Sequence, residues 1–365
     1  MALTTIYPEH YQQQLADKAE LLQQMLNPYS SAQLEVFPSP AEYYRMRAEF
    51  RIWHDGDDLY YIMFDSETQQ RIRVDQFPIA SKLINQLMPA LLDYVRDRPK
   101  LRYRLFQVDF LTTTTNQAVV SLLYHRPLDE QWQQEAEQLR QHLSQFGTIH
   151  IVGRARKQKL CVDQDWVVET LTMQNRHYHF QQIENSFTQP NAVVNQHMIS
   201  WALTVTADSY GDLLELYCGN GNFSLPMAQN FNHVLATEIS KTSVASARYN
   251  CALNNIDNVT LVRMSAEDFS AVMQGEKQSR RLPAEQFAHF NCQTVLVDPP
   301  RAGLDDATLE LVSRYPTIVY ISCNPKTLVK NLTRLTQTHQ VVRTALFDQF
   351  PYTSHMEAGV LLQRR

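Results

Sequence analysis

The feature that most constrains this chain is a strict alternation of strand-like and helix-like segments after about residue 185. Short apolar runs recur there with a helical window between most of them, which is typical of a doubly wound, mostly parallel sheet in an α/β fold. The candidate strands are 213–218, 234–239, 259–264, 294–297, 317–322, 341–347 and 357–363. Such sheets bind ligands beyond the carboxyl ends of their strands, so we expect the chemistry at the strand ends.

The first strand runs into Tyr217-Cys-Gly-Asn-Gly-Asn222, where two of the chain's nine Gly fall within three residues. Glycine permits a tight turn and lets the backbone approach a ligand closely. Glu238 ends the next strand, where a carboxylate can accept hydrogen bonds from both ribose hydroxyls of an adenosine. A dinucleotide fingerprint needs a third Gly where Ser224 stands, so the pattern favours S-adenosylmethionine over NAD.

Two further strand ends carry reactive residues. Asp298-Pro-Pro-Arg301 follows the fourth strand, and its prolines hold the backbone extended. Amino-group methyltransferases usually place an aromatic residue after such a motif, so Arg301 counts against that class. Cys323 follows the fifth strand, directly before Asn324 and Pro325, which are good N-cap and first-turn residues of a helix. The helix dipole then favours the Cys323 thiolate, although a buried structural Cys is the other interpretation.

The first half of the chain has a different pattern and predicts an α+β domain. A leading helix is followed by two strand pairs, each with a helical stretch after it: 8–26, then 44–53 with 59–64, then 103–111 with 118–124. We therefore expect two domains, 1–184 and 185–365. No apolar run approaches the roughly 18 residues that cross a bilayer. The first residues lack the layout of a secretory signal, and the cysteines form no CxxC pair. These features predict a cytoplasmic protein.

The charge of the chain is slightly acidic, at a formal net −5. Bulk attraction to nucleic acid therefore does not follow from composition. Local clusters differ from this average, because basic residues gather at two places: Arg96, Arg98, Lys100, Arg102 and Arg104, and then Arg154, Arg156, Lys157 and Lys159. Such a cluster is as often a solvated face as a binding surface.

Several motifs together resemble the RNA 5-methyluridine methyltransferases. They are Tyr217-Cys-Gly-Asn-Gly-Asn222, Asp298-Pro-Pro-Arg301, Ser322-Cys-Asn-Pro325 and Phe350-Pro-Tyr-Thr-Ser-His-Met-Glu357. Tyr44-Arg-Met-Arg-Ala-Glu-Phe50 and Phe187-Thr-Gln-Pro190 extend the resemblance over nearly the whole chain, and it is closest to the bacterial tRNA (uracil-5-)-methyltransferases. Many ribosomal-RNA relatives hold an iron–sulfur cluster on N-terminal Cys. This chain has no Cys before Cys161, so neither that cluster nor a metal is expected.

The resemblance implies methyl transfer to C5 of the T-loop uridine of tRNA, at tRNA position 54. It implies that Cys323 is the nucleophile that adds to C6 of uracil, and that Glu357 removes the C5 proton after methyl transfer. The residues that it places around S-adenosylmethionine are Gln189, Tyr217, Asn222, Glu238 and Asp298. Whether Asp298 contacts the cofactor or the uracil is left open.

The target base must leave its stack to reach Cys323, and RNA is usually read through loops, aromatic side chains and shape. Candidates for RNA contact are Arg45, Arg47, Arg51, Arg96, Arg98, Arg102 and Phe106, of which Phe106 fits a core position equally well. The expected partner is the T-arm of tRNA, or another RNA with a T-loop-like element. Two alternatives stay open: a cluster-free 23S rRNA uracil-C5 methyltransferase, and a non-catalytic RNA-binding or folding factor on a methyltransferase scaffold.

Overall fold

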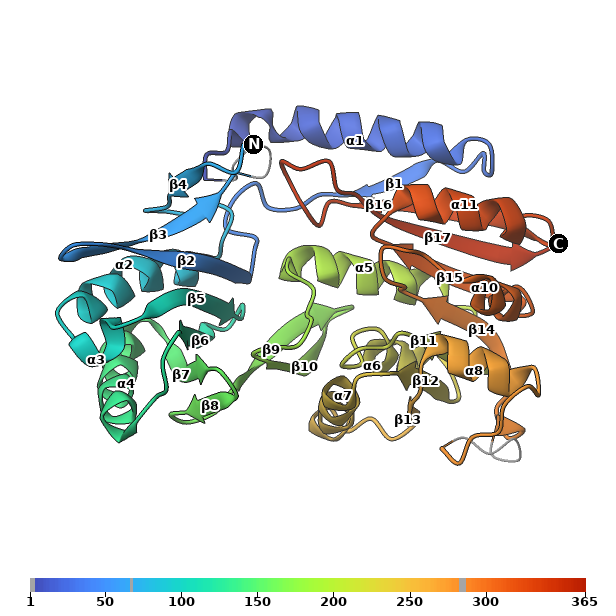
Figure 1. Cartoon of the computed structure of the whole chain (residues 1–365). Helices are drawn as coiled ribbons and strands as arrows, with labels where there is room; N and C mark the ends of the chain where they lie inside the picture. The colour runs from blue at the N-terminus through green and yellow to red at the C-terminus, as the bar shows by residue number, and fades with distance from the viewer. Residues whose placement is uncertain (1–3, 66–67, 282–286) are drawn as a thin grey trace. The chain divides into compact units, whose positions relative to one another are not determined.

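The computed structural model of the chain describes residues 4–65, 68–281 and 287–365 (Figure 1). It divides into two compact units, each built from separate stretches of sequence. The first unit comprises Met1–Glu9, Pro40–Thr170 and Gln182–Ala192, and the second comprises His10–Ser39, Leu171–Gln181 and Val193–Arg365. A single cut between 184 and 185 does not describe this division, mainly because the leading helix belongs to the second unit. Over the described residues, no helix is long and apolar enough to span a membrane.

A sheet of order β4-β3-β2-β5-β6-β7-β8 forms the first unit. Its neighbours are antiparallel except for β6 and β7, which run parallel. Both predicted strand pairs are confirmed, as β2 with β3 and β5 with β6. The strands are β2 (Arg47–Asp55), β3 (Asp58–Phe64), β4 (Arg71–Arg73), β5 (Leu105–Thr112), β6 (Gln117–Tyr124), β7 (Thr148–Ala155) and β8 (Gln158–Cys161).

Helices cover one face of this sheet. Tyr61 of β3 donates a hydrogen bond to Met88 O of α2 at 3.0 Å, so its side of the sheet faces that helix. Because side chains alternate along a strand, Tyr60 lies on the opposite side. Along β2, Phe50 and Ile52 are buried, whereas Arg51 and its odd-numbered neighbours are exposed. The helices are α2 (Lys82–Arg96), α3 (Pro99–Arg102) and α4 (Glu130–Leu143), with a 3-10 turn at Ser144–Phe146. A further 3-10 turn, Pro8–His10, directly precedes the leading helix.

Strands β9 (Trp166–Met173) and β10 (Arg176–Ile183) pair as a hairpin, and their residues are divided between the two units. The segment 182–192 that follows returns to the first unit, where Met46 N donates to Pro190 O at 2.8 Å.

The second unit contains the predicted doubly wound sheet, of order β1-β16-β17-β15-β14-β11-β12-β13. The neighbours are parallel apart from β17, which runs antiparallel between β15 and β16. Its strands are β1 (Leu34–Phe37), β11 (Asp212–Leu216), β12 (Val234–Glu238), β13 (Val259–Arg263), β14 (Cys292–Val297), β15 (Thr317–Ser322), β16 (His339–Phe347) and β17 (Glu357–Arg364).

The strand order reverses around β11, which has β12 on one side and β14 on the other. A crevice opens at such a switch point beyond the carboxyl ends of the strands. Leu213, Leu214 and Leu216 of β11 are fully buried and fix the strand in the core. The helices of this unit are α1 (Tyr11–Leu26), α5 (Ala192–Val205), α6 (Ser224–Met227), α7 (Lys241–Leu253), α8 (Ala266–Met273), α10 (Asp306–Val312) and α11 (Pro325–Leu335), with a 3-10 turn at Ala228–Asn230.

The leading helix α1 joins the second unit through one buried stripe. Tyr11, Leu15, Leu22 and Leu26 are each 7% exposed or less. The helix contacts α11 and β1, and β1 adds to the sheet as a parallel neighbour of β16. This packing is why the leading helix does not belong to the α+β unit that follows it in sequence.

Candidate functional site

Strand β11 ends in a tight turn that contains Tyr217, Gly219 and Gly221. All three residues have positive φ, at 65°, 56° and 87°. A Cβ added at Gly221 would lie 2.2 Å from the Leu225 side chain, whereas among the described residues no atom lies within 4 Å of the same position at Gly219. The turn is therefore open at Gly219, and a ligand can approach the backbone there.

Glu238 lies beside this turn, at the end of β12. Its Oε2 accepts a hydrogen bond from Gly219 N at 3.1 Å, and its Oε1 accepts one from Ser240 N at 2.7 Å. These bonds fix the carboxylate, and each oxygen keeps a second lone pair for a ligand hydroxyl. The position suits the predicted ribose acceptor, a role that stays a prediction.

Asn222 and Tyr217 flank the same turn. Asn222 forms a reciprocal amide pair with the buried Asn195 of α5, with N–O distances of 2.8 and 2.9 Å. Tyr217 is half-buried, and burial raises the pKa of its hydroxyl, as do the carboxylates of Glu267 and Asp305. The structure therefore brings Tyr217, Asn222 and Glu238 together around one turn.

Cys323 directly follows β15. Asn324 accepts a hydrogen bond from Lys326 N at 3.2 Å, and Pro325 begins α11, so the predicted N-cap is confirmed. Ser322 pairs with Ala358 of the antiparallel β17, and this register places Cys323 beside Glu357. The motifs at 322–325 and 350–357 thus meet at the end of the sheet where β15 finishes and β17 begins.

The electrostatics of Cys323 correct the expectation that the helix dipole favours its thiolate. Burial raises the pKa of the thiol to about 11, and the carboxylates of Glu357 and Asp298 act in the same direction. The guanidinium of Arg301 opposes them. Burial and the two acidic neighbours therefore favour the protonated thiol in the absence of ligand.

Glu357 and Asp298 interact electrostatically at this end of the sheet. Glu357 is 3% exposed, and burial together with Asp298 raises the pKa of its carboxyl well above the usual range, against Arg301. Burial also raises the pKa of Asp298. Two close carboxyls resist double ionisation, so their two protons leave in separate steps that belong to the pair and not to either residue alone. A carboxyl with a raised pKa is a stronger base once it is ionised.

Sequence reasoning missed Glu215 as a member of this acidic site. It is buried in β11, accepts a hydrogen bond from Ser224 Oγ, and burial raises its pKa to about 8, with Asp298 and Glu238 adding to the rise. The available signal was a lone acid inside the apolar run Leu-Leu-Glu-Leu. His355 was also missed, and its Nε2 lies 3.5 Å from Nη2 of Arg301.

Several predicted RNA-contact residues lie in the first unit and bind backbone oxygens there. Arg45 Nε donates to Arg47 O at 2.8 Å. Arg47 donates to Ser186 O and Glu184 O, both at 2.7 Å, and so holds the segment 182–192. The predicted cofactor residue Gln189 belongs to this segment, whereas the other four belong to the second unit.

Arg51 and Phe106 are brought together on the exposed side of the same sheet. The Arg51 guanidinium lies 5.3 Å from the centre of the Phe106 ring. Phe106 stacks on His125 with centroids 3.8 Å apart and planes 9° from parallel. Phe106 is half-buried, whereas Arg51 and His125 are exposed, so the three side chains place aromatic rings and the Arg51 cation at the surface.

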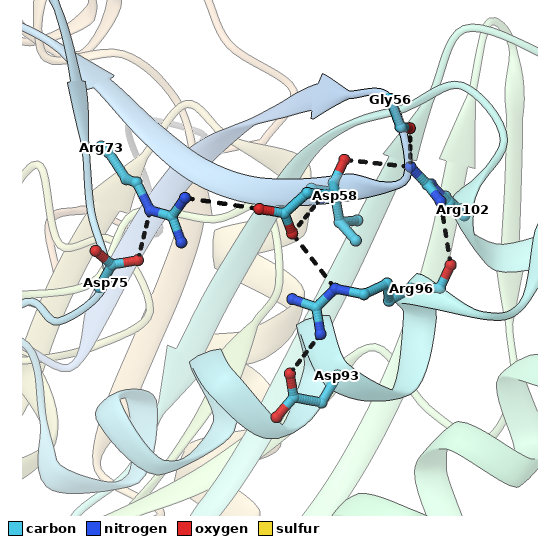
Figure 2. Close-up of polar contacts among 8 residues, drawn as sticks. Gly56, Asp58, Arg73, Asp75, Asp93, Arg96 and Arg102 are labelled. Atoms are coloured by element: carbon cyan, nitrogen blue, oxygen red, sulfur yellow. Dashed lines mark hydrogen bonds and ion pairs between the residues drawn. The ribbon is translucent and has the colours of Figure 1, made fainter.

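Figure 2 shows that Arg96 and Arg102 belong to a network of hydrogen bonds and ion pairs around Asp58. Arg96 pairs with Asp93 at 2.8 Å and with Asp58 at 3.4 Å, and Arg102 donates to Gly56 O at 2.5 Å. Arg98 donates to Tyr94 O at 2.7 Å and covers the Tyr94 ring. A hollow of about 690 Å³ opens here, and His54, Arg96, Arg102, Tyr103 and Arg104 are among the residues that line it.

The second unit thus combines a nucleophilic side chain, a carboxyl with a raised pKa and an acid-lined turn. A thiol beside a carboxyl can add covalently to an electron-poor carbon and then pass a proton. A positively charged ligand beside Glu215, Asp298 and Glu357 would favour the ionised forms of these carboxyls, whose pKa values burial raises.

Comparisons with known proteins agree with this geometry. The family model described as tRNA (Uracil-5-)-methyltransferase matches residues 10–365. A protein of Erwinia tasmaniensis named tRNA/tmRNA (uracil-C(5))-methyltransferase is 59% identical over 358 residues, which cover 98% of each chain. One of the same name from Escherichia coli O157:H7 is 59% identical over 355 residues, 97% of each chain.

Among solved structures, the chain is similar to the Pyrococcus abyssi tRNA (uracil-54, C5)-methyltransferase, which was crystallised in complex with S-adenosyl-L-homocysteine. The TM-score is 0.71 and the sequence identity 19%, and the match covers 96% of this chain and 83% of that one. At this identity the likeness confirms the fold, a Rossmann-like methyltransferase sheet with an accompanying α+β unit.

Proposed function

This chain belongs to the tRNA (uracil-5-)-methyltransferase family, and on that premise we propose that it methylates C5 of the T-loop uridine at tRNA position 54 through a covalent cysteine adduct. The observation that carries the proposal is the pairing of β15 with β17, which sets the Cys323 thiol beside the Glu357 carboxyl. Those two groups are what addition at C6 and proton removal at C5 require.

Tyr217, Asn222, Glu238 and Asp298 would hold S-adenosylmethionine, with Gln189 added by resemblance. The opening at Gly219 leaves room for this cofactor, and its sulfonium cation would favour the ionised forms of Glu215, Asp298 and Glu357, whose pKa values burial raises. When bound, S-adenosylmethionine supplies an electrophilic methyl group. The Glu238 carboxylate would accept hydrogen bonds from the ribose hydroxyls, and the acid-lined rim would stabilise the positive charge.

Cys323 would act first, as a thiolate. Its sulfur forms a bond to C6 of uracil, and the electron pair of the C5–C6 double bond moves toward the C4 carbonyl, which makes C5 nucleophilic. C5 would then take the methyl group, whose bond to the cofactor sulfur breaks, and the cofactor would leave as a neutral thioether. Glu357 removes the remaining C5 proton, the C–H electron pair restores the C5–C6 double bond, and the sulfur leaves C6 as thiolate.

The first unit would bind the T-arm of tRNA. The Arg51 cation above Phe106 supports this role, because RNA binders combine aromatic faces with arginine. Arg45 and Arg47 would act indirectly, through the backbone segments they hold. The name of these relatives also includes tmRNA, so we add an RNA with a T-loop-like element as a second substrate. The proposal places the enzyme in the cytoplasm, where these RNAs occur.

The test is methyl transfer from labelled S-adenosylmethionine to unmodified RNA. We expect label in tRNA at position 54 and none in a matched tRNA that carries cytidine there. Label in 23S rRNA alone would favour the ribosomal alternative. RNA binding with no transfer to any RNA would favour the non-catalytic scaffold.

A further inference from the structure

Lys18 is a charged residue on the buried face of α1. Lys18 is only 6% exposed and lies one helical turn from the buried Leu15 and Leu22. Lysine is almost never fully buried unless it is paired. Burial lowers the pKa of Lys18, and Asp348 opposes that effect and favours the charged form. An apolar residue would serve packing alone, so the charge requires another explanation.

Lys18 binds two groups of the loop 348–356, which joins β16 to β17. Its Nζ lies 2.7 Å from Oδ1 of Asp348, whose side chain is 0% exposed, and it donates to Phe350 O at 2.9 Å. One helical turn earlier, Gln14 Oε1 accepts a hydrogen bond from Tyr352 N. Helix α1 therefore holds this loop at three points.

The same loop leads directly to Glu357. Phe350 O also accepts from Thr353 Oγ1 at 2.8 Å, and the Phe350 ring meets His355 edge-on with centroids 5.9 Å apart. Phe347 pairs with Glu357 across β16 and β17, so the loop starts and ends at one strand pair. The path of residues 348–356 thus fixes where β17 begins and where the Glu357 carboxyl lies.

We propose that Lys18 is a positioning residue, whose contacts with Asp348 and Phe350 hold the loop 348–356 so that Glu357 stays beside Cys323. The inference rests on the proposed function, in which Glu357 removes the C5 proton. A buried ion pair adds little net stability compared with apolar side chains of similar size. Its directed bonds instead give the loop a defined position, which a flexible apolar side chain does not.

The test uses the whole enzyme and three variants. Lys18→Met removes the cation, and Lys18→Met with Asp348→Asn avoids an unpaired buried carboxylate. We expect both to lower kcat at least tenfold with an unchanged KM for S-adenosylmethionine. Both should also accumulate a methylated protein–RNA adduct, because proton removal becomes slow. Lys18→Arg should restore part of kcat, since it keeps the charge.

The matched control is Arg343→Met, which breaks the pair of Arg343 with Glu35 at 2.8 Å in the same unit. It leaves the contacts of the loop intact, so kcat should stay near wild type. Wild-type kcat in the Lys18→Met, Asp348→Asn variant would overturn the inference. So would a lower kcat without adduct under conditions in which Glu357→Gln forms one, because general loss of folded enzyme gives that result.

Hydrogen exchange separates the failure of this inference from the failure of the proposed function. If Glu357→Gln forms no adduct, the proposed mechanism is wrong. The positioning role of Lys18 is then tested only by the hydrogen-exchange rates of the backbone amides in the loop 348–356. Faster exchange at 348–356 in the Lys18 variants, with β11 and β12 unchanged, supports the positioning role. Unchanged exchange in the loop overturns it.

Discussion

Cys323 and Glu357 serve different steps of the proposed reaction, so their variants should fail in different ways. Without the Cys323 thiolate no bond forms at C6, and C5 stays unreactive. We expect Cys323→Ala to lose methyl transfer while S-adenosylmethionine and tRNA still bind, as calorimetry would measure. Cys292→Ala is the matched control, because both thiols are partly exposed and free. Appreciable turnover by Cys323→Ala would rule out the covalent mechanism.

Glu357→Gln keeps the shape of the side chain but removes the base. Addition of Cys323 and transfer of the methyl group should still occur, and elimination should stall because the C5 proton has no acceptor. We expect a protein–RNA adduct that survives denaturing electrophoresis and carries the labelled methyl. The adduct should be absent when Cys323→Ala is added. Wild-type turnover without an adduct would mean that another group takes the proton.

The pH dependence follows from the same two side chains. Burial raises the pKa of Cys323 to about 11 and also raises that of Glu357, and both groups must be deprotonated to act. Adduct formation needs only the Cys323 thiolate, so its rate should rise with pH, by about tenfold per pH unit where the thiolate limits it. Asp298→Asn removes a neighbouring negative charge, which lowers both pKa values and should shift the profile toward lower pH. A flat profile from pH 6 to pH 9 would contradict this electrostatic account.

At the scale of helices and strands, the parts that present the site were predictable because their signals are local. Gly219 and Gly221 mark the turn after β11, and Asn324 with Pro325 marks the start of α11. The alternation of strand-like and helix-like segments predicted that the sheet is doubly wound and mostly parallel. These are short-range rules of backbone geometry that do not depend on the rest of the fold.

Features that depend on distant segments were not predictable. Strand β1 pairs with β16, some 300 residues later, and no local pattern announces such a partner. The pKa of Cys323 depends on Glu357, which only the register of β15 with β17 brings near. Strands β7 to β10 were also missed. Their neighbours in the sheet decide their burial more than their own sequence does.

The basic segment of α2 and α3 yields a prediction at this scale. Arg96, Arg98 and Arg102 make bonds within the first unit, but Arg96 keeps 35% of its side chain exposed, and exposed ion pairs contribute little to stability. Replacing all three by Gln should leave the unit folded, weaken tRNA binding and flatten its salt dependence, because fewer counterions are released. Filter binding across a salt series would measure this.

Arg73→Gln is the control for that experiment. Arg73 also pairs with Asp58, as Figure 2 shows, but it lies outside the basic segment. If the triple variant keeps the wild-type salt slope, the segment is a solvated face that holds the hairpin of β2 and β3. If Arg73→Gln flattens the slope equally, the effect comes from freeing Asp58 rather than from lost phosphate contacts.

At the scale of the whole chain, each unit is assembled from separate stretches, and this limits how the molecule can be divided. The methyltransferase sheet needs residues 10–39, which supply α1 and β1. Burying Tyr11, Leu15, Leu22 and Leu26 contributes about 1.5–3 kcal/mol each, or about 6–12 kcal/mol together. A typical domain is stable by only about 5–15 kcal/mol after the conformational entropy of folding is subtracted, so losing this burial is enough to destabilise the unit.

We therefore predict that residues 171–365 alone do not fold cooperatively, although they contain every motif of the proposed active site. Without α1, the side chain of Asp348 loses its partner Lys18, and without β1, strand β16 becomes an exposed edge strand. Joining residues 10–39 to 171–365 through a flexible linker should restore a single cooperative transition in thermal unfolding followed by circular dichroism. A linked protein in which Lys18→Met and Leu22→Ala are combined should lose most of that gain. Cooperative unfolding of the unlinked fragment, at a similar midpoint, would mean that the sheet is stable without its leading helix.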